Sequence, residues 1–305
     1  MQLLGLPALA LVAMTLSSQG VVVNFDFNVN TGTNSNIGIG AAGDTYQGLG
    51  AAPDSASNTF WNSVRRSSSN TVSSASGLNN SVTNGGPIRD SSGVATNIDV
   101  LLSSTATLAG TTGMGHQRST GGQQELGLNS EYEDLMADFL QLNAPGADSA
   151  GNLGTINGTI NGLVANGIYE LYFYGQGATY GLPGSTTSGA NSFFAITSTL
   201  GGSIVGSGKQ TGWDGTSGGN GTLSEDVEYV KFTATANATG EIFFIWQNVM
   251  AGVNVATDHA TDSTGGSSDL AALNAIQVVS VTVPEPSAFL LTALGAFSLL
   301  RRRRR

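Results

Sequence analysis

An aromatic residue followed by an acidic one, Trp213-Asp214, is the pair in this sequence best suited to hold a ligand. The pair lies in a glycine-rich stretch, and Tyr180 lies in another. Exposed indole and phenol rings stack on the apolar faces of sugars, while nearby carboxylates accept hydrogen bonds from sugar hydroxyls. These three residues form the candidate carbohydrate site. The alternative is that Trp213 folds back over the edge of the domain as a packing residue.

Three aspartates in one polar segment, Asp258, Asp262 and Asp269, are the candidate metal ligands. Carboxylates are hard oxygen ligands of the kind that Ca²⁺ takes in proteins. Their spacing matches no calcium loop, and aspartate among serines and threonines commonly forms turns. A Ca²⁺ site and simple turn formation therefore stand as the two interpretations, and the sequence predicts no other cofactor.

Motifs associated with catalysis occur here without the structural context that they need. Residues 38–43 match the glycine pattern of a dinucleotide-binding loop, but no strand-and-helix unit surrounds them. Residues 215–219 match the turn around a hydrolase serine, again without a flanking strand and helix. The two histidines, His116 and His259, lie in stretches rich in Gly, Ser and Thr, where we expect them to be solvated loop residues. We therefore predict no catalytic residues and a protein that is not an enzyme.

The charge of the chain limits which partners it can bind, and the lack of cysteine limits what can stabilise its fold. The chain has 21 acidic and 11 basic residues, and five of the basic ones are its last five residues. The rest is strongly acidic, which excludes nucleic acid as a partner because phosphates attract clustered lysine and arginine. There is no cysteine, so a hydrophobic core must supply the stability that disulfides give many exported proteins.

Composition and alternation predict an all-β fold, a single β-sandwich. The 43 glycines and many Ser, Thr and Asn residues favour turns between short strands. Period-two alternation between turn residues predicts strands at 21–27, 156–163, 167–174, 191–197, 228–236, 241–247 and 272–283. Among these, 167–174 is expected to be a central strand. The segments 227–234 and 241–247 are expected to pair as a hairpin.

One short capping helix is predicted at residues 131–140. Ser130 and Glu133 have the spacing of a capping box, and the acidic first turn suits the positive end of the helix dipole. Apolar residues recur on one face of this segment, at Leu135, Met136, Phe139 and Leu140. The helix is expected to plug one end of the sandwich.

The C-terminus combines three features in a meaningful order. Pro284-Glu285-Pro286 ends the last strand-like segment, because proline lacks a backbone donor. Apolar and small residues follow at 287–300, enough for a helix of about 21 Å against a hydrocarbon core of about 30 Å. The chain then ends in a cluster that stays in the cytoplasm: Arg301, Arg302, Arg303, Arg304 and Arg305.

This tail closely resembles the PEP-CTERM sorting signal, which a membrane-embedded exosortase recognises in Gram-negative bacteria. The resemblance implies that Pro284, Glu285 and Pro286 are the recognition motif and that the apolar helix is a temporary anchor in the inner membrane. An export signal is expected at residues 1–20, where an apolar run ends in small residues that a signal peptidase reads. The alternative is a tail-anchored protein in which Pro-Glu-Pro is only a linker.

More loosely, the order of strand-like segments over residues 155–279 resembles the galactose-binding-like jelly-roll domains. The expected organisation is then a signal peptide at 1–20, a β-sandwich body at 21–283 and a sorting signal at 284–305. We expect an exported, non-catalytic protein of the cell surface or extracellular matrix. A carbohydrate-binding module for extracellular polysaccharide is the alternative, and a polysaccharide-active enzyme is a distant third.

Overall fold

The computed structural model describes residues 20–28, 48–52, 60–65, 88–104, 114–118, 132, 135–136, 138–143, 153–175, 192–212, 221–249 and 270–281. The segment Val21–Val281 forms one compact unit, and strands are its main elements. Apart from Gly20, the predicted export signal lies outside the described residues, as does the whole tail from Pro284 onward. No helix in the described part of the chain is long and apolar enough to cross a membrane.

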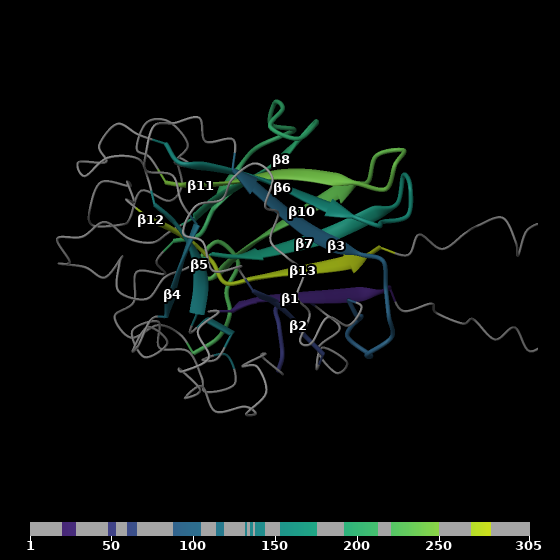
Figure 1. Ribbon diagram of the computed structural model, residues 1–305, viewed down its shortest axis with the longest axis horizontal. Helices are drawn as coiled ribbons and strands as arrows, with labels where there is room; N and C mark the ends of the chain where they lie inside the picture. The colour runs from purple at the N-terminus through teal and green to yellow at the C-terminus, as the bar shows by residue number, and fades with distance from the viewer. Residues whose placement is uncertain are drawn as a thin grey trace, which may run out of the picture. The chain divides into compact units, whose positions relative to one another are not determined.

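The first sheet has five strands, and it places the first and last described strands side by side (Figure 1). Its order is β10 (Tyr229–Thr235), β7 (Ile168–Tyr174), β13 (Ala275–Ser280), β1 (Val22–Asn28) and β2 (Asn62–Arg65). Neighbours are antiparallel except β1 and β2, which are parallel. Because β7 pairs with both β10 and β13, the prediction of a central strand at 167–174 is confirmed.

The second sheet also has five strands, and all its pairs are antiparallel. Its order is β3 (Asp99–Ser104), β6 (Thr155–Asn161), β11 (Ile242–Asn248), β8 (Ser192–Thr197) and β9 (Lys209–Gln210). A third, smaller sheet has the order β12 (Leu270–Leu273), β5 (Asp138–Asn143) and β4 (Met114–Arg118).

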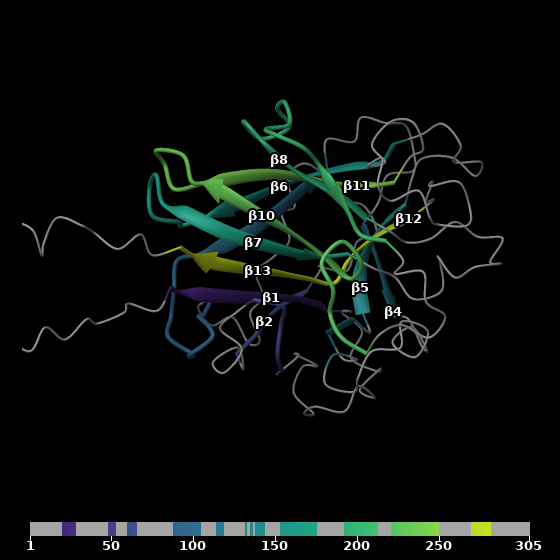
Figure 2. The same cartoon turned by 180° about the vertical axis from the view of Figure 1, so that it is seen from behind.

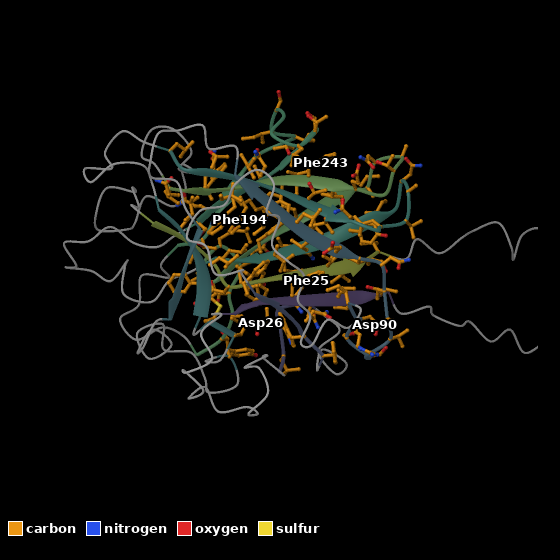
Figure 3. The ribbon with its side chains drawn as sticks, viewed as in Figure 1. Phe25, Asp26, Asp90, Phe194 and Phe243 are labelled. Atoms are coloured by element: carbon orange, nitrogen blue, oxygen red, sulfur yellow. The ribbon has the colours of Figure 1, made fainter. Side chains whose placement is uncertain are left out.

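The first two sheets face one another across a shared hydrophobic core, as Figure 2 shows from behind. Alternate residues of each strand point inward, for example Phe25 and Phe27 from β1 and Phe244 and Trp246 from β11. Phe25 and Phe194 come from opposite sheets and both lie in the interior (Figure 3). The predicted all-β, sandwich-like architecture is therefore confirmed.

Aromatic side chains fill the middle of this core. The ring of Phe173, from the first sheet, lies 5.1 Å from that of Phe194 and 4.8 Å from that of Phe244, both from the second. Gly158 pairs with Phe244 across the second sheet, and a Cβ there would come within 2.0 Å of the Phe244 ring. A glycine at this strand position thus makes room for the largest ring cluster in the described core.

The third sheet covers one end of the sandwich, and its strand β5 occupies part of the segment that was predicted to be a helix. Tyr132, Leu135 and Met136 are helical, but the chain is in β5 from Asp138 onward. Leu140 pairs with Leu273 on one side and His116 on the other, and two ladders outweigh the helix signals at its position. The helix is therefore shorter than the predicted 131–140. The strand residues Leu140 and Leu142 join the sandwich core, whereas the helical residues Leu135 and Met136 are buried in a second cluster against the first sheet.

The predicted hairpin is wrong, because its two strands belong to different sheets. β10 pairs with β7 in the first sheet, and β11 pairs with β6 and β8 in the second. The turn between them is tightly closed, since Asn237 Oδ1 accepts hydrogen bonds from the backbone N–H groups of Thr239 and Glu241. Both strands have inward apolar residues, so they bury more surface facing each other across the core than pairing edge to edge.

The two ends of the compact unit lie together at one end of the sandwich. The backbone N–H of Val21 donates to Ser280 Oγ over 2.7 Å, and the N–H of Ser280 donates to the Val21 carbonyl over 2.8 Å. The N–H of Val281 donates to the Ile168 carbonyl. We call this the terminal end. It comprises Val21, residues 280–281 and three short turns at 90–98, 162–167 and 236–241. The opposite end, which carries the third sheet, is the far end.

Replacing Trp246 by alanine should destabilise the protein by about 3 to 5 kcal/mol, because its indole is fully buried between the two sheets. Urea unfolding followed by circular dichroism measures the loss. Phe243→Ala is the matched control, since Phe243 lies three residues earlier on the opposite, half-exposed face of the same strand (Figure 3). Equal losses for the two variants would contradict the assignment of Trp246 to the core.

Candidate functional site

None of the residues predicted to carry function is among the described residues. Outside them lie the sorting motif and arginine cluster of the tail and both sets of candidate ligand residues, Tyr180, Trp213 and Asp214 and Asp258, Asp262 and Asp269. In the described part of the chain, no three His, Cys, Asp or Glu side chains gather to hold a metal ion. The structure does describe the residues that flank each of these segments, and their geometry constrains where the segments begin and end.

The segments with candidate ligand residues begin and end at neighbouring points of the far end. Tyr180 falls between Gly175 and Ser192, Trp213 and Asp214 directly follow Gly212, and the three aspartates fall between Val249 and Leu270. Gly175, Ser192, Thr211 and Ala272 are joined by side-chain hydrogen bonds. The roots of all three segments therefore meet, although they are far apart in the sequence.

The Thr211 hydroxyl makes the first of these connections. It donates a hydrogen bond to the Gly175 carbonyl, at the end of β7, and accepts one from the Ser192 N–H over 2.9 Å, at the start of β8. Thr211 is fully buried. A buried hydroxyl with both roles satisfied fixes the spacing between its partners, because losing either bond would leave a polar group without water or protein.

The Ser192 hydroxyl makes the second connection. It donates to the Ala272 carbonyl and accepts from the Ala272 N–H over 2.8 Å and from Trp246 Nε1 over 3.2 Å. One donor and two acceptor positions are thus all used, which is the full capacity of a serine hydroxyl. We call Ser192, Thr211 and their partners the root cluster. It joins β8, β11 and β12 at the point where the three segments leave the sandwich.

The sequence contains no signal for the root cluster. Ser192 and Thr211 stand in polar surroundings of the kind that fill the whole chain, and their burial depends on pairings between distant strands. The residues singled out from the sequence lie within the three segments, outside the described residues, and the two hydroxyls that hold the roots were missed. The root cluster positions candidate residues and makes no contact with a ligand among the described residues.

A second polar group lies on the outer face of the first sheet, where Tyr172, Lys231 and Glu170 meet. Lys231 Nζ lies 2.8 Å from Glu170 Oε1 and 5.3 Å from the centre of the Tyr172 ring, and the Tyr172 hydroxyl donates to Glu170 Oε2. Burial raises the pKa of Tyr172 to about 12, and the hydrogen bond to Glu170 raises the pKa of Lys231. Neither the phenol nor the ammonium releases a proton near neutral pH. The ion pair and the hydrogen bond therefore brace β7 against β10.

Comparisons with known proteins leave the family open. No protein-family model matches the sequence, and no curated protein matches it. Among solved structures, the enzymatically active domain of tailspike protein 4 from bacteriophage CBA120 is similar with a TM-score of 0.27 and 13% sequence identity. The alignment covers 60% of this chain and 19% of that one, so this chain spans about a fifth of the tailspike chain. A likeness this weak defines neither fold nor function.

Thr211→Val should destabilise the protein by about 1 to 3 kcal/mol, because valine keeps the shape but leaves the Gly175 carbonyl and the Ser192 N–H without their buried partner. Equilibrium unfolding in urea measures the difference. Thr233→Val is the control, since Thr233 is exposed on β10 and should change stability little. If both variants match the wild type, the root cluster does not hold the far end together.

Proposed function

We propose that this protein is exported, is held briefly at the inner membrane by its tail, and is processed by an exosortase to become a non-catalytic protein of the cell surface or extracellular matrix. The observation that carries the proposal is the order of Pro284-Glu285-Pro286, the apolar run at 287–300 and five terminal arginines. The short apolar run suits temporary anchoring, and the arginines keep the C-terminus in the cytoplasm.

The geometry of the body supports this order of events. β13 ends at Ser280, Val281 is still hydrogen-bonded to Ile168, and Pro284 follows three residues later. The recognition motif thus stands between a completed sheet and the apolar run, where prolines keep the chain extended. The N-terminal signal would join the body beside the same point, at Val21, so both processing sites would leave the far end unobstructed.

Replacing Pro284, Glu285 and Pro286 together by alanine should leave an uncleaved, membrane-bound protein in the native cell. The exosortase would lose its recognition motif, while the apolar run and the arginines would still anchor the chain. Membrane fractionation with intact-mass measurement distinguishes the two forms. The control is Thr282→Ala with Val283→Ala, which changes neighbouring residues and should be processed normally. Normal cleavage of the triple variant would contradict the sorting assignment.

A carbohydrate-binding role for the body is the second candidate, and the root cluster favours it. Three segments that together contain an aromatic pair and several carboxylates start from one hydrogen-bonded point. Convergence of segments on a rigid base is how sandwich domains commonly build binding sites. The looser jelly-roll proposal rests on β6, β7, β8, β10, β11 and β13, which alternate between the two large sheets when the two-residue β9 and β12 of the third sheet are set aside.

Trp213→Ala should remove binding to matrix polysaccharide and leave the melting temperature nearly unchanged, because an exposed stacking ring contributes to binding more than to the core. Calorimetric titration with polysaccharide from the native matrix, beside thermal unfolding, tests both parts. Trp213→Tyr is the matched control and should keep part of the affinity, since a phenol ring also stacks. Equal binding by the wild type and Trp213→Ala would remove this site from consideration.

A further inference from the structure

Exposed aliphatic side chains gather at the terminal end of the sandwich. Val21 is 43% exposed, Val94 61%, Val164 72% and Val281 38%. Elsewhere in the described chain, the large apolar side chains with such exposure are Leu101 in β3 and Leu200, Ile204 and Val205 in the loop after β8. Single exposed valines are ordinary on a soluble protein. Four around the point where the chain enters and leaves the sandwich need an explanation.

Hydrogen bonds connect the segments that carry Val21, Val94, Val164 and Val281 into one continuous surface, which we call the rim. The Ser91 N–H donates to the Val22 carbonyl, which joins the turn of Val94 to the start of β1. Val21 bonds to Ser280, and Val281 bonds to Ile168. Ile168 directly follows the turn of Val164. That turn bonds in its own right to residues 236–241, through Leu163 and Asn166. The rim therefore presents its side chains from a fixed frame.

The turns of the rim carry almost no charge. The segments 90–98, 162–167 and 236–241 contain no lysine or arginine, and their two carboxylates are Asp90 and Glu241. Asp90, which lies at this end in Figure 3, accepts hydrogen bonds from the Ser92 and Val94 N–H groups. Glu241 accepts from the side chains of Thr239 and Asn237. Both carboxylates are held by their own turns, so the side chains exposed beside the valines are mainly small or uncharged, such as those of Ser92, Asn166 and Thr239.

The length of the connection to the tail places this rim beside the membrane. Six residue steps separate Val281 from Ser287, where the apolar run begins, and a fully extended chain of that length spans about 20 Å. This step rests on the proposed function, because it takes residues 287–300 as the membrane anchor. Before cleavage, the terminal end then has no room to lie far from the lipid headgroups.

We propose that the terminal end of the body docks on the extracytoplasmic surface of the lipid bilayer before processing, with Val94 and Val164 at the boundary between headgroups and acyl chains. Aliphatic side chains gain there from leaving water. Among the described residues of these turns and their flanks, the basic side chain is that of Arg89, whose guanidinium donates to the Gly93 carbonyl, so zwitterionic lipid suffices and a single arginine limits what anionic lipid adds. Docking holds the Pro-Glu-Pro segment at the membrane surface, within reach of a membrane-embedded protease.

The absence of native cysteine makes single-cysteine labelling a direct test. The full-length chain with Val94→Cys or Val164→Cys, each carrying an environment-sensitive fluorophore, is reconstituted into vesicles of phosphatidylcholine and phosphatidylethanolamine that contain a shallow lipid-borne quencher. Both labels should lose most of their fluorescence. Glu225→Cys is the control, an exposed position that bridges to Tyr229 at the start of β10, at the opposite end of that strand from the rim turn 236–241. It should stay unquenched.

Flotation of the vesicles tests the membrane anchor separately from the docking of the rim. A chain that does not float with the lipid overturns the membrane anchor and this inference with it. A chain that floats while both rim labels stay as bright as the Glu225→Cys control overturns only the docking of the rim.

A third label tests whether the two valines cause the docking. Thr239→Cys, an exposed position in the turn 236–241, should be quenched in the otherwise wild-type chain and released when Val94→Asp and Val164→Asp are added, with the melting temperature unchanged. A Thr239 label that is never quenched, in a chain whose processing in the native cell is slowed by the two aspartates, would assign the rim to a protein partner and overturn the lipid assignment.

Discussion

The pairing of β1 with β13 is the interaction on which the rest of the structure depends. The two strands come from opposite ends of the compact unit, align Val22 with Val279, and lie inside the first sheet, with β2 and β7 on their outer sides. The sheet cannot be completed until the last strand is available, and such non-local pairing forms slowly. Because β13 ends at Ser280, the first sheet is completed only when the last residues of the compact unit are available. The same pairing forces both chain ends to one end of the sandwich.

A buried polar network reinforces this pairing on the outer face of the first sheet. Gln277 of β13 donates to Asn24 of β1, and its carbonyl oxygen accepts hydrogen bonds from the Tyr174 hydroxyl and the Ala52 N–H. The Ala51 N–H donates to the same tyrosine oxygen. Three strands and a covering segment are thus joined through one amide. Breaking it would leave several buried groups unpaired, which is costly where no water can enter. The outer face of the first sheet is therefore buried around this network, as the sandwich core is buried between the sheets.

Local pattern predicted the strands that became β1, β6, β7, β8, β10, β11 and β13, but it missed β2, β3, β4, β5 and β9. His116, which was expected in a loop, lies in β4. The pattern failed wherever the partner of a residue decided its state. Residues 168–174 alternate so strongly that their strand could be predicted, and even its central place followed from its apolar character. Asn24 and Gln277 also sit in alternation and would be expected to face solvent, yet both are fully buried under residues from elsewhere in the chain. Leu140 fits a helical face equally well, and only β4 and β12 make it a strand residue. No local sequence pattern indicates the role of Ser192 and Thr211, because their hydrogen bonds join segments that are far apart in the sequence.

The two ends of the sandwich differ in a way that one topology explains. Short turns with glycines of positive φ close the terminal end; Gly162 lies so near the Asn97 carbonyl that a Cβ would stand 1.9 Å from its oxygen, and Gly240 similarly crowds Leu163. Such turns leave no length for a ligand-binding loop, so what this end presents is a compact apolar rim. At the far end the root cluster holds fixed the starting points of three long segments. The antiparallel pairing of β1 with β13 accounts for this division, because it brings the start and the end of the compact unit together at the terminal end and leaves the far end to the longer segments.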